Sequence, residues 1–550
     1  MKKFLIFFTL VIAVGGSVAW FNRIELMLFM ISKRTDAQYD IRPNREVVWQ
    51  QGPETESKAL NQKPNIIFIV LDDVGYNDIS TFGGGIAGGL LKTPHIDKLA
   101  SESVVFRQSY AGNATCAPSR GMMMTGRYQN TTGYEFTPFP GGAGPLISVS
   151  NSIDRNMPET LPGFENDVPF ENQGLPAEEV TIAEVLKERG YYTAHIGKWH
   201  MGRYNGMAPN DQGFDDSLYM HSGLYLPEDH PDVVNAKLEQ DPIDKILWAR
   251  LRYSATFNNA TDEDLFQPKG YLTDFWTNES VKVIKANKNR PFFLYLAHWG
   301  THTPLQATRA DYEAVGDIKP HNRRVYAAMM RAIDRSVGKI QQALEETGQA
   351  DNTMIVFTSD NGGAGYVGLP ELNKPFRGWK LTFFEGGLRV PHFIKWPNGL
   401  PEAKELDTPV MHIDIFPTLA AAAGAPLPQN VKIDGVNLLP YARGKGAIKE
   451  RPLFFQSGFY RAIRLGDWKL KVSENPKKVW LYDLKEDPTE QNNLAEQIPT
   501  KVSELHHLIK NHIASGKGAR YPYSILAPIL IDKTNEQSYK KGDEYIYWPN

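Results

Sequence analysis

The stretch NIIFIVLDD, residues 65–73, joins an apolar run to two adjacent carboxylates. The run has the length of a single strand and no polar alternation, which is typical of a strand buried on both faces. Such strands belong to parallel sheets that are covered by helices on both sides. Asp72 and Asp73 stand where this strand would end. The stretch therefore predicts a polar site at the edge of a parallel sheet.

Further strand-like runs alternate with helical patterns along the chain. The runs are YYTAHI (191–196), PFFLYLA (291–297), TMIVFTS (353–359) and VPHFIKW (390–396). Thr181 and Glu184 form a capping box that begins a helix before Gly190. A longer helix, ended by Gly348, carries apolar residues at helical spacing: Val325, Met329, Ile333, Val337, Ile340 and Leu344. This alternation predicts an α/β fold, a large mixed, mostly parallel sheet sandwiched by helices.

The pattern changes after about residue 445. The short strand candidates PLFFQS, YRAIRL, WKLKVS and VWLYDL follow one another closely, and a helix is expected near residues 498–513. They predict a smaller C-terminal antiparallel sheet plus a helix. We therefore expect an α/β domain over residues 61–445 and a C-terminal α+β subdomain over residues 446–550. A polar, aperiodic segment, residues 32–60, is interpreted as a linker.

The N-terminal segment, residues 1–31, has the layout of an export signal. Lys2 and Lys3 precede an apolar run from Phe4 to Phe21. The run is long enough for either a cleaved signal peptide or a membrane anchor. The segment predicts an exported protein, periplasmic or extracellular, with an anchor as one alternative.

Charge and cysteine content narrow the classes of function. The formal net charge of −3 provides no field that would attract a nucleic acid, so no nucleic-acid partner is expected. The chain has one cysteine, Cys116, so it forms no internal disulfide. Cys116 is therefore either a small buried apolar residue or a reactive group.

Polar residues follow each expected parallel strand. They are Asp72 and Asp73, then Lys198 and His200, then His298 and His302, and finally Asp360 and Asn361. Ligands of open α/β sheets bind beyond the carboxyl ends of the strands, so these clusters are expected to converge. The oxygen donors among them suit calcium or magnesium. Taken singly, each acidic pair also fits a helix N-cap or a turn.

Cys116 begins the sequence CAPSRG (116–121), and TGR follows at 125–127. This pattern resembles the signature of the formylglycine-dependent sulfatases, a branch of the alkaline phosphatase superfamily. Similar blocks occur in the expected order over residues 63–500: LDDVGYND, GKWHMG, PFFLYLAHWGTHTPL, TSDNGG and RGWKLTFFEGGLRVP. One departure is TPHID at 93–97, where that family usually has TPNID. We interpret His95 as a substitution at a helix start, away from the chemistry.

The resemblance implies a sulfuric ester hydrolase in which Cys116 is oxidised to formylglycine. The maturation partner would be a formylglycine-generating enzyme or an anaerobic sulfatase-maturating enzyme. One calcium ion would be held by Asp72, Asp73, Cys116, Asp360 and Asn361. Asp360 would also accept the proton of the attacking hydroxyl, while Arg120 and Lys198 would stabilise the aldehyde hydrate and the sulfate charge. His302 and Lys380 would bind sulfate and protonate the leaving oxygen, and His200 would accept a proton as sulfate departs.

The substrate expected from these features is a sulfated carbohydrate attacked at a terminal unit. Four aromatic residues after the cysteine motif could stack on sugar rings or simply pack in the core: Tyr128, Tyr134, Phe136 and Phe139. His298 and His412 are expected to be structural, as is His221 unless it approaches the substrate. The alternatives are an arylsulfatase for small aryl sulfates, a phosphodiester or phosphonate ester hydrolase on the same scaffold, and an inactive polysaccharide-binding relative.

Overall fold

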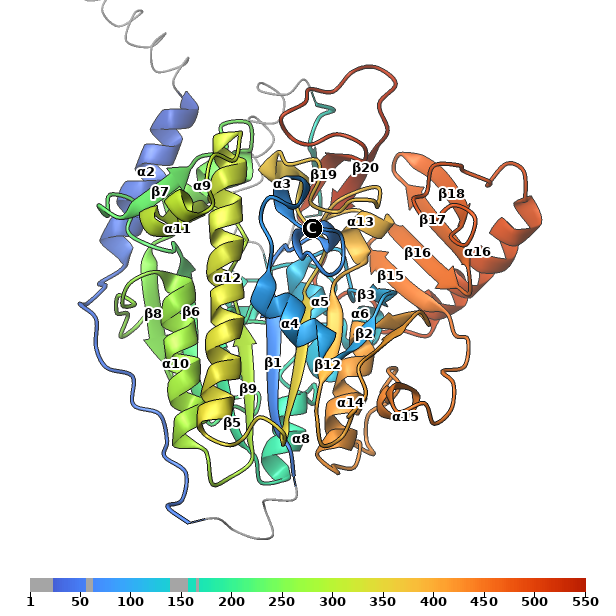
Figure 1. The fold of residues 1–550 in the computed structure, drawn as a ribbon. Coiled ribbons are helices and arrows are strands. Elements are labelled where there is room, and N and C mark those ends of the chain that lie inside the picture. The colour runs from blue at the N-terminus through green and yellow to red at the C-terminus, as the bar shows by residue number, and fades with distance from the viewer. Residues whose placement is uncertain (1–22, 56–62, 139–156, 165–167) are drawn as a thin grey trace, which may run out of the picture.

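A nine-stranded mixed sheet forms the centre of the molecule (Figure 1). The computed structural model describes residues 23–55, 63–138, 157–164 and 168–550. The strand order is β13-β2-β12-β11-β1-β9-β5-β6-β8, and the five strands from β11 to β6 are parallel. Their bounds are β11 Thr353–Ser359, β1 Asn65–Leu71, β9 Phe292–Ala297, β5 Tyr192–Gly197 and β6 Asp216–Gly223. The outer strands are β13 Lys404–Leu406, β2 Val104–Phe106, β12 His392–Lys395 and β8 Tyr253–Phe257.

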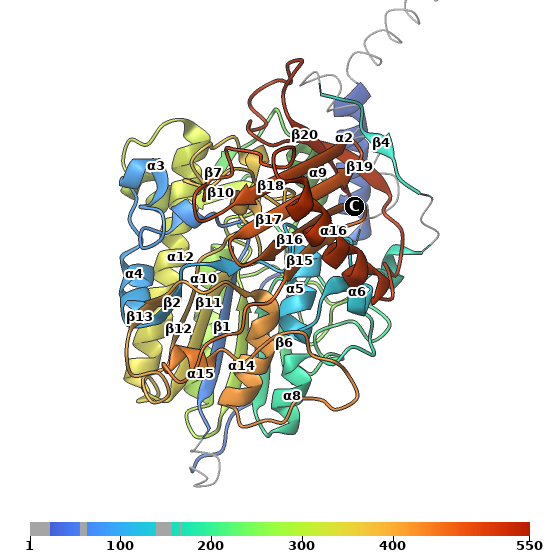
Figure 2. The ribbon, with the colours of Figure 1, turned by 90° about the vertical axis from the view of Figure 1, so that its right-hand side faces the viewer.

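Helices cover both faces of this sheet, as Figure 2 shows from the side. Ile67, Ile69 and Leu71 of β1 belong to one apolar cluster, whereas Ile66, Phe68 and Val70 belong to another. Successive side chains of a strand point to opposite faces, so a strand covered on both sides is apolar throughout. The first face is covered by α4 Pro94–Ser101, α10 Leu272–Ala286 and α12 His321–Glu346, the second by α5 Cys116–Thr125, α8 Ile182–Glu188 and α14 Ile415–Ala422. The predicted α/β fold is confirmed.

Local sequence signals account for several of these elements. The Thr181 side chain accepts a hydrogen bond from the Glu184 amide, and the Glu184 carboxylate accepts one from the Thr181 amide. This is the predicted capping box at the start of α8. All six predicted apolar positions of α12 are buried, and Gly348 has a φ of 68° just beyond its end. A left-handed glycine at that place is a common end of a helix.

The predicted C-terminal antiparallel sheet is formed by β15 Leu453–Ser457, β16 Tyr460–Leu465, β17 Trp468–Glu474 and β18 Lys477–Asp483. The predicted helix is α16 Pro499–Ala514, and its Leu505 and Ile509 pack on Ile463 and Leu470 of the sheet. Between this sheet and the α/β domain, the buried Lys469 ammonium lies 2.7 Å from Glu385. Beyond α16, β19 Ile525–Leu530 pairs with β20 Tyr545–Pro549 and with β4 Leu161–Pro162. The sequence did not predict this three-stranded sheet.

The interpretation of residues 32–60 as a linker is wrong for two parts of that segment. Residues 32–38 belong to α2 Arg23–Gln38, which packs on α9 Pro242–Arg250. Val47 and Trp49 are buried in the main apolar cluster, and the Trp49 indole donates to Glu279 at 2.8 Å. Val47 and Trp49 are isolated apolar residues in a polar stretch, so the sequence shows no periodic pattern there. Burial of these two side chains nevertheless holds the segment against the α/β domain.

Shorter elements complete the chain. They are α3 Ile86–Gly89, β3 Ser109–Tyr110, α6 Gln129–Thr132, β7 Val233–Ala236, β10 Leu305–Thr308, α11 Arg309–Ala314, α13 Glu385–Leu388, β14 Val410–Met411 and α15 Leu439–Ala442. Residues 1–22 of the expected signal or anchor lie outside the described residues. Among the helices of the described part, none has the length and apolar character needed to cross a membrane.

Candidate active site

The carboxyl ends of four parallel strands bring the predicted polar residues together. Leu71 of β1 is paired with Ser359 of β11, so Asp72 and Asp360 leave the sheet side by side. The Asp73 amide donates to Asp360 Oδ1 at 3.3 Å, and Asn361 Nδ2 donates to Asp73 Oδ1 at 2.8 Å. Asp73 has a φ of 59°, a left-handed conformation that an aspartate tolerates better than most residues. Parallel register thus brings Asp72 and Asp73 beside Asp360 and Asn361, almost 290 residues further along the sequence.

The Arg120 guanidinium bridges the carboxylates of Asp72 and Asp360, which follow the two strands. Its Nη2 lies 3.1 Å from Asp72 Oδ2 and 2.7 Å from Asp360 Oδ2, and its side chain is fully buried. Burial alone would lower the pKa of Arg120, but Asp360, Tyr295 and Asp72 raise it above its usual value. Burial and the neighbouring Asp72 raise the pKa of Asp360, which the Arg120 charge partly offsets. Arg120 is therefore a permanent cation that compensates two buried acids.

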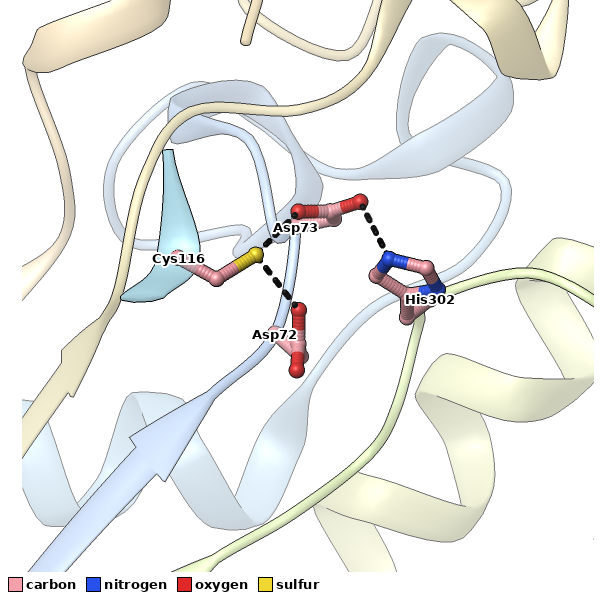
Figure 3. A group of neighbouring side chains, drawn as sticks. All are labelled: Asp72, Asp73, Cys116 and His302. Carbon is pink, nitrogen blue, oxygen red and sulfur yellow. Dashed lines mark hydrogen bonds and ion pairs between the residues drawn. The ribbon is translucent and has the colours of Figure 1, made fainter. Parts of the chain in front are cut away.

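Cys116 is the first residue of α5, and its side chain points into the carboxylate cluster (Figure 3). The thiol donates toward Asp72 Oδ1 at 3.4 Å and toward Asp73 Oδ1 at 3.7 Å. Burial, followed by the charges of Asp360 and Asp72, raises the pKa of the Cys116 thiol well above its usual value. An unmodified thiol at this place stays protonated and is a poor nucleophile.

Two lysines contact the carboxylates of the cluster. Lys198, which follows β5, has its Nζ 2.6 Å from Asp72 Oδ2 and 4.7 Å from the centre of the Trp299 ring. Lys380 Nζ lies 2.7 Å from Asp73 Oδ1. Burial would lower the pKa of Lys380, but Asp73 and its neighbours raise it well above the usual value. Lys380 therefore carries a proton at neutral pH.

Among the expected site residues, His200 and His302 are partly exposed, whereas the others are buried. His302 Nε2 is 3.7 Å from Asp73 Oδ2, and its ring stacks on Trp299 with 4.1 Å between centroids. Burial lowers the pKa of His302 to about 3, so the ring is neutral without a bound anion. His200 has a φ of 64°, and its backbone carbonyl accepts a hydrogen bond from the Tyr134 hydroxyl at 2.7 Å. Burial and the charge of Lys198 lower the pKa of His200 well below its usual value.

The donor set fits a hard cation. Ligand atoms of Asp72, Asp73, Cys116 and His302 lie within 4.8 Å of one another. Asn361 Oδ1 is buried and has no hydrogen-bond partner among the described residues, while its Nδ2 is bonded to Asp73. An unpaired buried amide oxygen is costly unless a cation binds it. Oxygen atoms from three carboxylates and this amide are the ligands that calcium prefers. The expected ligands therefore converge, and His302 lies beside them.

Tyr366 is a site residue that no sequence pattern predicted. Its hydroxyl donates to Asp73 Oδ2 at 2.5 Å and accepts from Lys380 Nζ at 3.2 Å. It therefore holds the carboxylate and the lysine in one network. Tyr366 lies in the segment GAGYVG, and nothing in that local sequence indicates a contact with residue 73. Only the folded chain reveals it.

The aromatic residues after the cysteine motif are packing residues. Tyr128, Tyr134 and Phe136 are all buried, so the core interpretation is confirmed for them, whereas Phe139 lies outside the described residues. His298 and His412 are also structural, as expected. His298 Nε2 lies 3.0 Å from Ser336 Oγ, and His412 connects Ser119 to Thr358. His221 is paired with Asp262 at 2.8 Å.

Comparison with known proteins agrees with this arrangement. Residues 64–425 match the family model described as Sulfatase. The chain belongs to the sulfatase family. Residues 378–517 of this sulfatase also match the model described as N-sulphoglucosamine sulphohydrolase, C-terminal. The protein is thus a sulfuric ester hydrolase, in agreement with the expectation from the cysteine motif.

Named relatives of the sulfatase cover most of its length. N-acetylgalactosamine-6-sulfatase of Canis lupus familiaris is 32% identical over 419 residues, 74% of this chain and 71% of that protein. N-acetylgalactosamine-6-O-sulfatase of Bacteroides thetaiotaomicron is 29% identical over 544 residues, 84% of this chain and 95% of that protein. The crystal structure of Ps i-CgsB in complex with k-i-k-neocarrahexaose is 31% identical, with a TM-score of 0.67 over 84% of this chain and 95% of that one.

Proposed function

We propose that the sulfatase removes sulfate from a terminal unit of a sulfated carbohydrate. The names of the two N-acetylgalactosamine sulfatases and the carbohydrate complex of Ps i-CgsB support this substrate class. The observation that carries the proposal is the position of Cys116 among two carboxylates and two lysines, with its Sγ 3.4 Å from Asp72. Cations around that atom suit an anionic ester rather than a neutral one.

The nucleophile of the proposed reaction is formylglycine made from Cys116. The raised pKa of the thiol argues against a thiolate nucleophile, so a modified side chain explains why the residue is a cysteine. In the present structure, the thiol sulfur stands in for the oxygen of the hydrated aldehyde. One hydroxyl of that hydrate attacks sulfur, and the other releases sulfate when the carbonyl forms again. The proposal requires a maturation enzyme of the formylglycine-generating or anaerobic sulfatase-maturating type.

Calcium held by Asp72, Asp73, Asp360 and Asn361 would supply positive charge against the sulfate oxygens. Arg120 orients Asp72 and Asp360 and supplies a positive charge to both, because it touches both carboxylates. Lys198 supplies a second positive charge 2.6 Å from Asp72, next to the attacking atom.

Proton transfer is assigned to His200, His302 and Lys380. Lys380 is protonated and, together with His302, faces the leaving oxygen. The negative charge of a bound sulfate ester raises the pKa of His302, which then holds a proton for the departing alcohol. His200 is kept neutral by burial and by Lys198, so it accepts a proton as sulfate is released.

Three measurements test the proposal. Mass spectrometry of the peptide that contains Cys116 should find a species lighter than the encoded one that reacts with a hydrazide, and Cys116→Ala should fold but not turn over. Fully active enzyme with only a free thiol would refute the nucleophile. Sulfated mono-, oligo- and polysaccharides should then be compared with an aryl sulfate and an aryl phosphodiester by kcat/KM. Faster hydrolysis of the aryl sulfate than of every carbohydrate would refute the substrate class.

The proposal includes export to the periplasm or the extracellular space, where polysaccharides are encountered. It is supported by the lysines and the apolar run of residues 2–21. Cell fractionation with an antibody to the full chain tests it, and recovery of active enzyme in the cytoplasm alone would contradict it.

A further inference from the structure

Two lysines of the C-terminal antiparallel sheet are fully buried. Lys469 and Lys471 lie on β17, where successive side chains point to opposite faces of the sheet, and neither is exposed to solvent. Lys469 faces the α/β domain, because it pairs with Glu385 of α13, whereas the neighbouring Leu470 packs on α16. Lysines are almost never fully buried unless they are paired. These two lysines therefore mark a fixed contact between the C-terminal subdomain and the α/β domain.

Two buried carboxylates share the charge of Lys469. Its Nζ lies 2.7 Å from Glu385 Oε1 and 3.2 Å from Glu490 Oε1. Glu490 also pairs with Lys471, and its Oε2 accepts a hydrogen bond from the backbone amide of Glu385 at 2.6 Å. Burial would raise the pKa of Glu385, but the charge of Lys469 and of nearby arginines holds that pKa below its usual value. The C-terminal subdomain thus fixes both the carboxylate and the backbone of Glu385.

Glu385 and Lys380 belong to the same closed loop. We call residues 377–387 the lysine loop. The amide of Gly386 donates to the carbonyl of Arg377 at 2.8 Å, so a backbone hydrogen bond joins the two ends of this loop. In Figure 1, α13, which begins at Glu385, lies between the central sheet and the C-terminal antiparallel sheet. Because the loop is closed and packed, a displacement of Glu385 is passed on to Lys380.

The other side of the lysine loop is bonded to the backbone of the reacting cluster. The amide of Lys380 donates to the carbonyl of Gly363 at 3.0 Å, and the next amide donates to the carbonyl of Ala114 at 2.8 Å. Gly363 stands two residues after Asn361, and Ala114 stands two residues before Cys116. The lysine loop therefore spans the distance from the buried lysines of the C-terminal sheet to the expected nucleophile and metal ligands.

We propose that Lys469 is a positioning residue for Lys380, and that it acts through Glu385 by fixing the lysine loop. The inference rests on the proposed role of Lys380 in the sulfatase reaction. A charge that stabilises a transition state must be placed accurately, since a misplacement of about 1 Å can lower a rate by about 10²-fold. In this way the C-terminal subdomain controls turnover through the placement of one ammonium group in the α/β domain.

A double-mutant cycle between Lys469 and Lys380 tests the proposal in the full-length, matured, calcium-loaded enzyme. Lys469→Met removes the charge and keeps most of the apolar side chain. Glu385→Gln is the second variant, since it retains an acceptor for the Tyr110 hydroxyl at 2.8 Å and removes only the paired charge, and it decides the outcome if Lys469→Met does not fold. Leu505→Ala is the matched control, because it weakens packing on the opposite face of the same sheet.

The measured quantity is kcat for the sulfate ester that the wild-type enzyme hydrolyses fastest in the substrate panel. We expect Lys469→Met to lower kcat roughly tenfold and Glu385→Gln to lower it about threefold or more, with a smaller change in KM. Leu505→Ala should keep kcat within about twofold of wild type, because it acts on folding alone. In the Lys380→Met background, Lys469→Met and Glu385→Gln should each change kcat by less than about twofold, since the group that they position is absent.

The same fold loss of kcat in the wild-type and Lys380→Met backgrounds would overturn the proposal, because the buried pair would then act on the site independently of Lys380. A kcat within twofold of the Leu505→Ala control for the folded single variants would also overturn it. An unchanged kcat for Lys380→Met alone would instead refute the role of Lys380 in the proposed function, and that variant is measured before the cycle is completed.

Discussion

Arg120 is expected to be the side chain whose loss costs the active site most stability. It is fully buried and touches Asp72 and Asp360, which are also fully buried. Substitution by methionine keeps much of the apolar volume but leaves the buried Asp360 without its paired cation and Asp72 with Lys198 alone. Removing one partner of a buried ion pair typically costs about 3–5 kcal/mol. For a chain of 550 residues, the usual unfolding entropy per residue converts this to a fall of about 3–4 °C in Tm.

The assay is calorimetric or fluorescence-detected thermal unfolding of Arg120→Met in chelator and in calcium. Arg42→Met is the matched control, since Arg42 pairs with Asp264 at 3.1 Å while its side chain is 63% exposed. Surface pairs of this kind contribute at most about 1 kcal/mol. We expect the fall in Tm to be largest in chelator and smaller in calcium, because the metal supplies positive charge between the same carboxylates. A fall for Arg120→Met in chelator no larger than that for Arg42→Met would refute this reasoning.

Three further predictions follow from the same contacts. Lys380→Met removes the cation 2.7 Å from Asp73 and should lower kcat for a sulfate ester by about 10²–10³-fold, even in excess calcium. A kcat within threefold of wild type would contradict the assigned role. Burial lowers the pKa of His195 and of His392 to about 3, so below pH 6.5 the unfolded chain binds protons that the folded chain does not. The free energy of unfolding should therefore fall by about 2 kcal/mol per histidine at pH 5. His195→Asn should flatten the dependence of Tm on pH between 7 and 5, and an unchanged slope would contradict this prediction. Chelation should abolish turnover and added calcium should restore it, whereas stoichiometric zinc in active, unchelated enzyme would count against the oxygen-ligand site.

Much of the framework could be predicted because its signals are local. The β1 run is apolar at every position from Ile66 to Leu71, and the structure divides these residues between two buried clusters. The capping box of Thr181 and Glu184 is a contact over three residues and formed as predicted. Strands of this type must end at a common edge, so the convergence of Asp72, Asp73, Asp360 and Asn361 could also be inferred.

Contacts between distant segments could not be predicted in this way. Tyr366 bonds to Asp73 across 293 residues, and no periodicity in either segment indicates it. Whether an aromatic residue packs in the core or faces a substrate is equally undecided by its type, and burial of Tyr128, Tyr134 and Phe136 settled the matter.

The sequence by itself determined which residues can do the chemistry and at which strand ends they stand. Periodicity of the side chains indicates which faces are buried and where strands and helices alternate along the chain. The tertiary structure alone decided which charges are paired, as when Arg120 bridges Asp72 and Asp360. The physical reason is that pairing energies depend on distance and burial in the folded chain, and neither quantity is encoded in the spacing of residues along the sequence.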